Sequence, residues 1–500
     1  MSFTFSAAPQ RQSFRERLIR VPLTGLVVGL LAVSLTACGG GDSISSSLVG
    51  TLDKTLGKTS DGMVTLSLGA GNDTTKGMVV QADGKALLIG TSTSTVSGTT
   101  SSNLTVERFN TDGTLDTSFG VGNNDGSPDG VVSLSLGDGN EEGTAIAVQT
   151  DGKIVVAGTT TSVIGSNSKN IVVARLNADG TLDATFGTAN DGTPDGVVNL
   201  SLSNGDDVSN ALAIQSDGKI VFAGTTSDIS GDNIVVARLN TDGSLDTTFG
   251  AGNADGSPDG VVTLSLGAGS DSAVAIAVQA DGRLVVAGNS TSTSGDNSNN
   301  IVVVRLNADG TMDAYFGTAN DGSPDGVVNV SLSSGDDMAN ALAIQSNGKI
   351  LVAGNSSNAS GKNAALIRLN ADGSLDTGFG AGVSDGTPDG VVGLSLGNGD
   401  DEFAAITVQA DGKIVVTGTT TSTGSSSNVF VARLLANGSL DAGFGNANDG
   451  TPDGIVNLSF GDGNDFARAV ALQADGKILV AGDRVNGSSS DITLARLLVN

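Results

Sequence analysis

One short pattern, Q-x-[DN]-G-[KR], recurs seven times at intervals of 64–68 residues. The copies begin at Gln81, Gln149, Gln215, Gln279, Gln345, Gln409 and Gln473. A fixed period of this size indicates structural units that cannot bury an apolar face alone and therefore pack on their neighbours. This constraint outweighs the length of 500 residues, which by itself would suggest several independent domains.

Each unit contains four segments with the character of strands. In one unit these are residues 211–215, 219–224, 233–240 and 261–266, which are apolar or alternating and are separated by turn residues. Four short antiparallel strands repeated seven times predict an all-β, seven-bladed β-propeller. The last unit stops after its third strand, and residues 63–68 lie before the first unit, so we expect this N-terminal strand to complete the C-terminal blade and close the ring. A calcium-binding parallel β-helix is the alternative, but its nine-residue period is absent.

A family resemblance follows from the residues of these units. The stretches ALAIQSDGKIVFAG, NIVVARLN and DGSLDTTFG resemble the Delta-60 repeat of bacterial proteins, over about residues 62–500. The resemblance implies repeated β-structure in a secreted or surface protein, and it implies no agreed activity. The chain departs from the family pattern by adding N-x-x-D-G-x-P-D-G after F-G, and Asn347 and Asn437 replace the usual Asp in two turns.

The N-terminus has the features of an export signal. Residues 11–20 carry four arginines, residues 21–35 are almost wholly apolar, and LTAC ends at Cys38, the only cysteine. This ending resembles the lipobox of bacterial lipoproteins, which implies acylation of Cys38; a plain signal peptide with an incidental Cys is the alternative. We therefore expect a leader at 1–38, a Gly/Ser-rich tether at 39–61 and the propeller at 62–500. Because Gly39 follows the Cys, the resemblance implies an outer membrane lipoprotein of the bacterial cell envelope, periplasmic or surface-exposed.

Composition limits the chemistry that the chain can perform. It has no His, which is the commonest general base and a common metal ligand, and one Tyr and no Trp, which weakens stacking on sugars or bases. The formal net charge of −28 disfavours nucleic acid as a partner. We expect a membrane contact through the lipid anchor, a monomer, and no cofactor other than calcium.

A motif with two carboxylates, D-G-[ST]-P-D-G, recurs in six units. Carboxylate, amide and backbone oxygens are the ligands of calcium, so the motif is a candidate metal loop; the alternative is a tight turn, because Gly and Pro set the backbone angles that bends require. The candidate ligands are Asp125, Asp129, Asp191, Asp195, Asp255, Asp259, Asp321, Asp325, Asp385, Asp389, Asp449 and Asp453.

A basic residue interrupts the apolar third strand of every unit, and an Asp follows in the L-D-x-x-F-G segment. A buried Arg–Asp pair could fix this corner of each blade above the Phe of F-G. The pairs considered are Arg175 with Asp183, Arg238 with Asp246, and Arg305 with Asp313; the seventh arginine, Arg496, has no L-D-x-x-F-G after it. The loops entering each first strand are acidic, and the late ones contain the non-repeated Glu402, Phe403, Phe466 and Arg468.

These observations favour a non-enzymatic, membrane-anchored propeller that serves as a scaffold for binding or structure. An adhesin or matrix protein with a specific protein or polysaccharide partner is one alternative. A calcium-dependent propeller hydrolase or lyase is another, and the absence of His counts against it.

Overall fold

The computed structural model describes most of the repeat region. The described residues are 19–20, 49–59, 61–96, 99–120, 129–136, 139–161, 168–187, 195–228, 231–250, 259–267, 269–291, 298–317, 325–358, 361–380, 389–396, 399–421, 426–445 and 453–499. Every named element in them is a strand.

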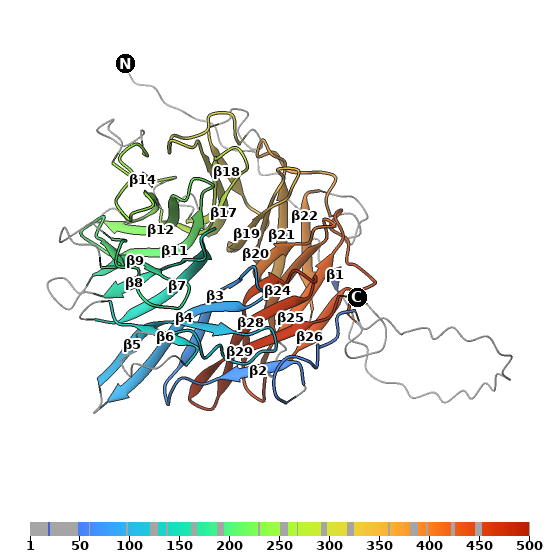
Figure 1. The fold of residues 1–500 in the computed structure, drawn as a ribbon. Helices are drawn as coiled ribbons and strands as arrows, with labels where there is room; N and C mark the ends of the chain where they lie inside the picture. Colours follow the sequence, from blue (N-terminus) through green and yellow to red (C-terminus); the bar gives the residue numbers. More distant parts are fainter. Residues whose placement is uncertain are drawn as a thin grey trace, which may run out of the picture.

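The strands form seven antiparallel sheets of four, which we call blades 1–7, and the strands of each blade are called A, B, C and D from the inside outward (Figure 1). Blade 1 contains β3 (Asp73–Val80), β4 (Ala86–Val96), β5 (Thr99–Phe109) and β6 (Val131–Leu134). Blade 2 contains β7 (Glu141–Val148), β8 (Ile154–Thr161), β9 (Lys169–Leu176) and β10 (Val197–Leu200). Blade 3 contains β11 (Asp207–Ile214), β12 (Ile220–Asp228), β13 (Gly231–Leu239) and β14 (Val261–Leu264).

The remaining blades repeat this order. Blade 4 contains β15 (Asp271–Val278), β16 (Leu284–Thr291), β17 (Asn299–Leu306) and β18 (Val327–Val330). Blade 5 contains β19 (Asp337–Ile344), β20 (Ile350–Asn358), β21 (Gly361–Leu369) and β22 (Val391–Ser395). Blade 6 contains β23 (Asp401–Val408), β24 (Ile414–Thr421), β25 (Ser427–Leu434) and β26 (Ile455–Leu458). Blade 7 contains β27 (Asp465–Leu472), β28 (Ile478–Asn486), β29 (Ser489–Leu497) and β2 (Met63–Leu66).

The seven-bladed prediction is confirmed, including the closure by an N-terminal strand. Strand β2 pairs antiparallel with β29, and Figure 1 shows the blue β2 beside the red β29. Each A strand contacts the A strands of both neighbouring blades, and β27 contacts β3, so the ring is complete. One further strand, β1 (Ile19–Arg20), lies in the segment predicted as a leader and pairs in parallel with β22, the outer strand of blade 5.

The apolar core lies between the blades, because the B and C strands are buried on both faces. Side chains of adjacent blades interdigitate: Val221 and Ile234 of blade 3, for example, share a cluster with Val286 and Val304 of blade 4. The predicted first strand at 211–215 in fact begins at Asp207, because its polar residues continue to pair with β12 around a β-bulge. The same bulge recurs in all seven A strands.

The structure differs from the predicted tether at 39–61. Residues 49–59 belong to blade 7, where they complete the corner that the C-terminus leaves unfinished. The backbone N–H of Asp53 donates to the carbonyl of Arg496 at 2.8 Å, and that of Gly50 donates to Leu498 at 2.7 Å. Leu56 is 1% exposed and takes the place that Phe occupies in the other corners. The boundary at residue 62 is therefore too late, and the propeller begins by residue 49.

Candidate functional site

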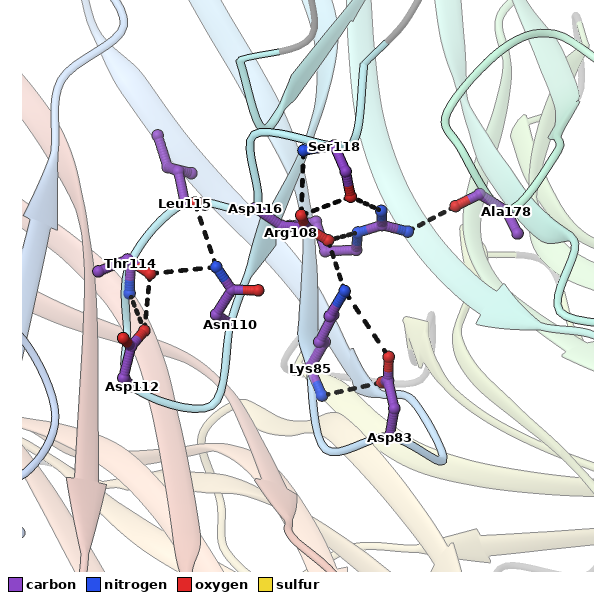
Figure 2. Close-up of polar contacts among 10 residues, drawn as sticks. All are labelled: Asp83, Lys85, Arg108, Asn110, Asp112, Thr114, Leu115, Asp116, Ser118 and Ala178. Carbon is purple, nitrogen blue, oxygen red and sulfur yellow. Dashed lines mark hydrogen bonds and ion pairs between the residues drawn. The ribbon is translucent and has the colours of Figure 1, made fainter.

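The repeated Arg–Asp pair forms the corner between strands C and D in every blade. Figure 2 shows this corner in blade 1: the Arg108 guanidinium lies between the Asp116 carboxylate and the carbonyl of Ala178. Its Nε is 2.7 Å from Asp116 Oδ2, and the Lys85 ammonium donates to the same oxygen at 2.7 Å. The guanidinium carbon lies 4.3 Å from the centre of the Phe119 ring. Arg108 and Asp116 thus link all of these groups into one cluster.

The predicted pairs lie in the same arrangement. Arg175 is 2.7 Å from Asp183, Arg238 is 2.7 Å from Asp246, and Arg305 is 2.8 Å from Asp313. Sequence reasoning missed the third member, the basic residue that ends Q-x-[DN]-G-[KR], which reaches the Asp across the A–B turn. These residues are Lys85, Lys153, Lys219, Arg283, Lys349, Lys413 and Lys477, at 2.6–3.2 Å from the carboxylate.

In six blades the corner also joins its blade to the next. Arg108 Nη1 donates to Ala178 of blade 2 at 2.5 Å, and Arg175 Nη1 donates to Thr241 of blade 3 at 2.5 Å. Arg496 donates in the same way to the carbonyl of Thr111, which joins the last blade to the first. Its partner Asp53, 2.8 Å away, comes from the N-terminal side of blade 7. The corners are therefore structural straps around the ring.

The charges of the corner control the protonation of its Asp. Burial alone would raise the pKa of Asp183, but hydrogen bonds from Lys153 and Thr185, together with the Arg175 charge, hold the pKa well below its usual range. The corresponding groups around Asp53 lower its pKa to about 2 against the same opposing effect of burial. These carboxylates therefore stay ionised at neutral pH and are poor general acids.

The second carboxylate of each D-G-[ST]-P-D-G motif caps a turn. Asp195 Oδ1 accepts the backbone N–H of Val197 at 2.9 Å, and Gly196 between them has a φ of +92°, which favours glycine. The same bond occurs at Asp129, Asp259, Asp325, Asp389 and Asp453. The first carboxylates, Asp125, Asp191, Asp255, Asp321, Asp385 and Asp449, lie outside the described residues, as does Cys38.

The acidic loops before the A strands also serve the fold. We call the face that carries these D–A loops and the B–C loops the D–A face. The first residue of every A strand is a carboxylate with 0% exposure, and the Oδ2 of Asp207, for example, accepts the N–H of Leu202 at 2.6 Å. The residue before it often accepts an N–H of the preceding blade, as Asp206 does from Lys169 at 2.9 Å. Within the described part of the chain, no group of three or more His, Cys, Asp and Glu is arranged to hold a metal ion.

On this face the repeat is broken where blade 7 meets blade 1, and we call the interface between these two blades the seam. At three other blade interfaces a neutral side chain (Thr91, Asn289 or Thr419) accepts the N–H at the third position of the next A strand. At the seam the acceptor is Asp483, which is 1% exposed and lies 2.7 Å from the N–H of Thr75.

A second charge completes this arrangement. Arg468 donates through Nε to the other oxygen of Asp483 at 2.7 Å, and its guanidinium carbon lies 5.3 Å from the Phe466 ring centre. Burial raises the pKa of Asp483, while the Arg468 charge opposes the rise. Lys76, on the adjacent A strand, is exposed and also favours the ionised form of Asp483. Three non-repeated charges, Lys76, Arg468 and Asp483, thus lie together at the seam.

The remaining late-loop candidates have different positions. Phe403 is fully buried and packs against Phe430, with ring centres 5.7 Å apart, so it belongs to the core rather than to a binding surface. Glu402 and Phe466 are partly exposed.

No helix that could cross a membrane is found among the residues that the structure describes.

Comparison with solved structures finds distant similarities. Virginiamycin B lyase from Staphylococcus aureus, in a catalytically inactive form with quinupristin, is 12% identical, with a TM-score of 0.45 over 87% of this chain and 98% of that one. The polysaccharide lyase Uly1 is 10% identical, with a TM-score of 0.45 over 87% and 91%. An α-L-arabinanase from Penicillium chrysogenum is 13% identical, with a TM-score of 0.38 over 71% and 92%. No curated protein matches the chain.

A family model matches every unit, in keeping with the repeat read from the sequence. The model is described as a domain of unknown function (DUF5122) beta-propeller, and it supports a repeated propeller rather than the Delta-60 name as such. The matched segments are residues 81–119, 149–186, 215–249, 279–316, 345–379, 409–444 and 473–500. All seven repeats of this β-propeller chain thus match the DUF5122 beta-propeller family.

Proposed function

We propose that the protein is a non-enzymatic binding scaffold of the bacterial cell envelope, anchored by a lipid on Cys38. The proposal rests mainly on one observation: the repeated ionisable groups pair with one another within the frame. Asp183, for example, contacts Arg175, Lys153 and Thr185, and the contacts with the two basic residues recur around the ring. Groups that are ionised, buried and mutually paired stabilise a frame and are themselves poor proton donors or nucleophiles toward a substrate.

The binding surface in this proposal is the D–A face. The opposite face repeats one corner in all blades, whereas the D–A face carries side chains that differ from blade to blade. Exposed or partly exposed examples on the A strands are Lys76, Glu142 and Glu402, which occupy different blades. A partner that contacts several blades would therefore meet a unique pattern of charge here, as selective recognition requires.

The anchor and the binding face are tested separately. Metabolic labelling with an alkyne fatty acid should mark the wild-type chain and bring it into the membrane fraction, and Cys38→Ala should abolish both. For binding, the full-length protein in detergent is passed over immobilised envelope polysaccharide and over immobilised envelope protein. A triple variant, Lys76→Ser, Glu142→Gln and Glu402→Gln, should lose retention, while Tyr315→Ser on the opposite face should keep it.

The same preparation distinguishes a scaffold from an enzyme. New reducing or unsaturated ends released from the polysaccharide, and abolished by changing one of these non-repeated residues, would contradict the scaffold proposal. Retention by the polysaccharide without cleavage, or by envelope protein, would identify the partner class of an adhesin or matrix protein.

A further inference from the structure

One carboxylic acid of the seam has no counterpart in the other blades. Glu107 lies in β5, directly before the strap arginine of blade 1. The other six blades have small or branched apolar residues at this place: Ala174, Ala237, Val304, Ile367, Ala432 and Ala495. Glu107 is 0% exposed, and within the described structure neither of its carboxyl oxygens has a hydrogen-bond partner.

Apart from the buried Thr105 hydroxyl, two residues away on the same strand face, the surroundings of Glu107 are apolar. It pairs with Leu88 across the sheet and lies two residues from Phe109, and alternation along the strand places the three side chains on one face. Leu88 and Phe109 pack against Leu479, Ala481, Ile492 and Leu494 of blade 7. The carboxyl group is thus enclosed in the interface between the first and the last blade.

This interface belongs to the non-covalent closure of the ring. Successive blades are connected by the chain, and the loop from β2 to β3 connects the outer strand of blade 7 to blade 1. The strands β27, β28 and β29 contact this N-terminal part without a covalent link, through pairing of β29 with β2, through the Asp53–Arg496 corner and across the seam. Loss of these contacts would open the ring without breaking any other blade.

We propose that Glu107 is a protonation-controlled latch of the propeller: the neutral acid packs in the apolar seam, and its ionisation separates blade 7 from blade 1. The proton goes to water on ionisation, and no other reactant is needed. An unpaired carboxylate in an apolar interface is strongly disfavoured. Glu107 must therefore remain protonated, or the interface must open and admit water.

The charged groups on the elements around Glu107 do not neutralise it. Asp73 on β3 shares its face and adds a repulsive charge. Other charges on the packed elements form ion pairs near the two ends of the interface, Arg468 with Asp483 and Arg496 with Asp53. Lys76 is exposed to solvent. Strands β2, β4 and β6 contribute no ionisable side chain. The remaining ionisable residues of these elements are Arg108, Asp465, Arg484 and Asp491.

The direction of the pH effect follows from the burial. Burial raises the pKa of Glu107 from 4.5 to about 8; the Thr105 hydroxyl partly offsets the rise, and the Asp73 charge adds to it. A carboxyl with a raised pKa in the folded state destabilises that state as pH rises above its unfolded pKa, and the effect is complete above its folded pKa. The equilibrium for opening the seam should therefore rise by roughly a thousandfold between about pH 4.5 and 8.

The test is amide hydrogen exchange of the full-length protein at pH 6 and pH 9, corrected for the intrinsic exchange rate. In the wild type, protection of peptides from β29 and β5 should fall at least tenfold at pH 9, while β12 and β13 of blade 3 remain protected. Glu107→Gln should remove this pH dependence, and the exposed control Glu142→Gln should retain it. Glu107→Ala, which installs the residue found in four other blades, serves if the Gln variant does not fold.

Two results would overturn the proposal. One is an unchanged pH dependence of seam protection in both Glu107 variants, which would assign the effect to other groups. The other is a loss of protection that is equal in all blades, which would show that the ring unfolds as a whole and that no latch exists at the seam.

Discussion

Replacing Asp53 by Asn removes one charge from the corner that both ends of the propeller build. The Asp53 side chain is 5% exposed, and its Oδ2 lies 2.8 Å from Arg496 Nε and 3.2 Å from Lys477 Nζ. Thr55 donates its backbone N–H and its hydroxyl to Oδ1 at 3.0 and 2.7 Å. An Asn oxygen can still accept from Thr55, so the substitution mainly removes the attraction to the two cations.

The magnitude follows from the protonation of this group. The pKa of Asp53 falls from 3.8 to about 2, and each unit of difference corresponds to about 1.36 kcal/mol. The ionised form therefore stabilises the fold by roughly 2–3 kcal/mol at neutral pH, and Asp53→Asn should lower the free energy of unfolding by about that amount. Because the folded pKa is depressed, this stabilisation is complete above pH 4 and is lost as pH falls through 2.

Urea unfolding at pH 7 and pH 3 measures both effects. The difference between wild type and Asp53→Asn should be largest at pH 7 and clearly smaller at pH 3. The control is Asp83→Asn, whose side chain is 57% exposed and lies 3.8 Å from Lys85, and which should cost less than about 0.5 kcal/mol. Equal stability of Asp53→Asn and wild type at pH 7, within 0.5 kcal/mol, would refute the assignment of residues 49–59 to blade 7.

Three further substitutions test the repeated parts of the frame by the same unfolding measurement. Arg238→Lys should lower the free energy of unfolding by about 2–3 kcal/mol, because an ammonium cannot contact the carboxylate, the carbonyl of the next blade and the aromatic ring together. The control Arg283→Lys, at an exposed site, should be nearly neutral. Equal effects of the two substitutions would contradict the structural role of the Arg238 corner. Gly224→Ala should destabilise by several kcal/mol because the new Cβ would lie 1.9 Å from a backbone oxygen, whereas Gly267→Ala has nothing within 4 Å and should be tolerated. Asp195→Asn should change the free energy of unfolding by less than about 0.5 kcal/mol, because the amide oxygen can still cap the turn, whereas Asp195→Ala should cost about 1 kcal/mol. A different result would identify the motif as a metal loop: added calcium would raise the melting temperature of the wild type but not that of the Asn variant.

Much of the frame could be predicted from the sequence because its causes are local. Alternating apolar runs and Asp-Gly turns specify the strands, and the repeated Arg and Asp lie in one corner because strand C leads directly into the loop. The contact of Lys85 with the corner could have been predicted from the basic residue that ends the A–B turn pattern in every unit. The hydrogen bond from Arg108 to Ala178 could not, because it depends on how far one blade is rotated against the next.

The strand that closes the ring was predicted, but the corner of blade 7 was missed, for a physical reason. The residues that complete blade 7 are split between the two ends of the chain, so the corner pattern is interrupted in the sequence. Residues 51–57 read T-L-D-K-T-L-G, in which Leu56 replaces the usual Phe. Glu107 could have been noticed as a Glu aligned with apolar residues, but its burial and its lack of partners are evident only once blade 7 is placed against it.

The most direct test of the closed ring is amide hydrogen exchange of residues 49–57 in the full-length protein at pH 7. The N–H groups of Gly50, Asp53, Leu56 and Gly57 all donate to backbone carbonyls, at 2.7–2.9 Å. A ring closed by both chain ends predicts protection of this segment comparable to that of its counterpart at 112–120 in blade 1. Complete exchange within seconds, as expected of a flexible tether, would contradict the account.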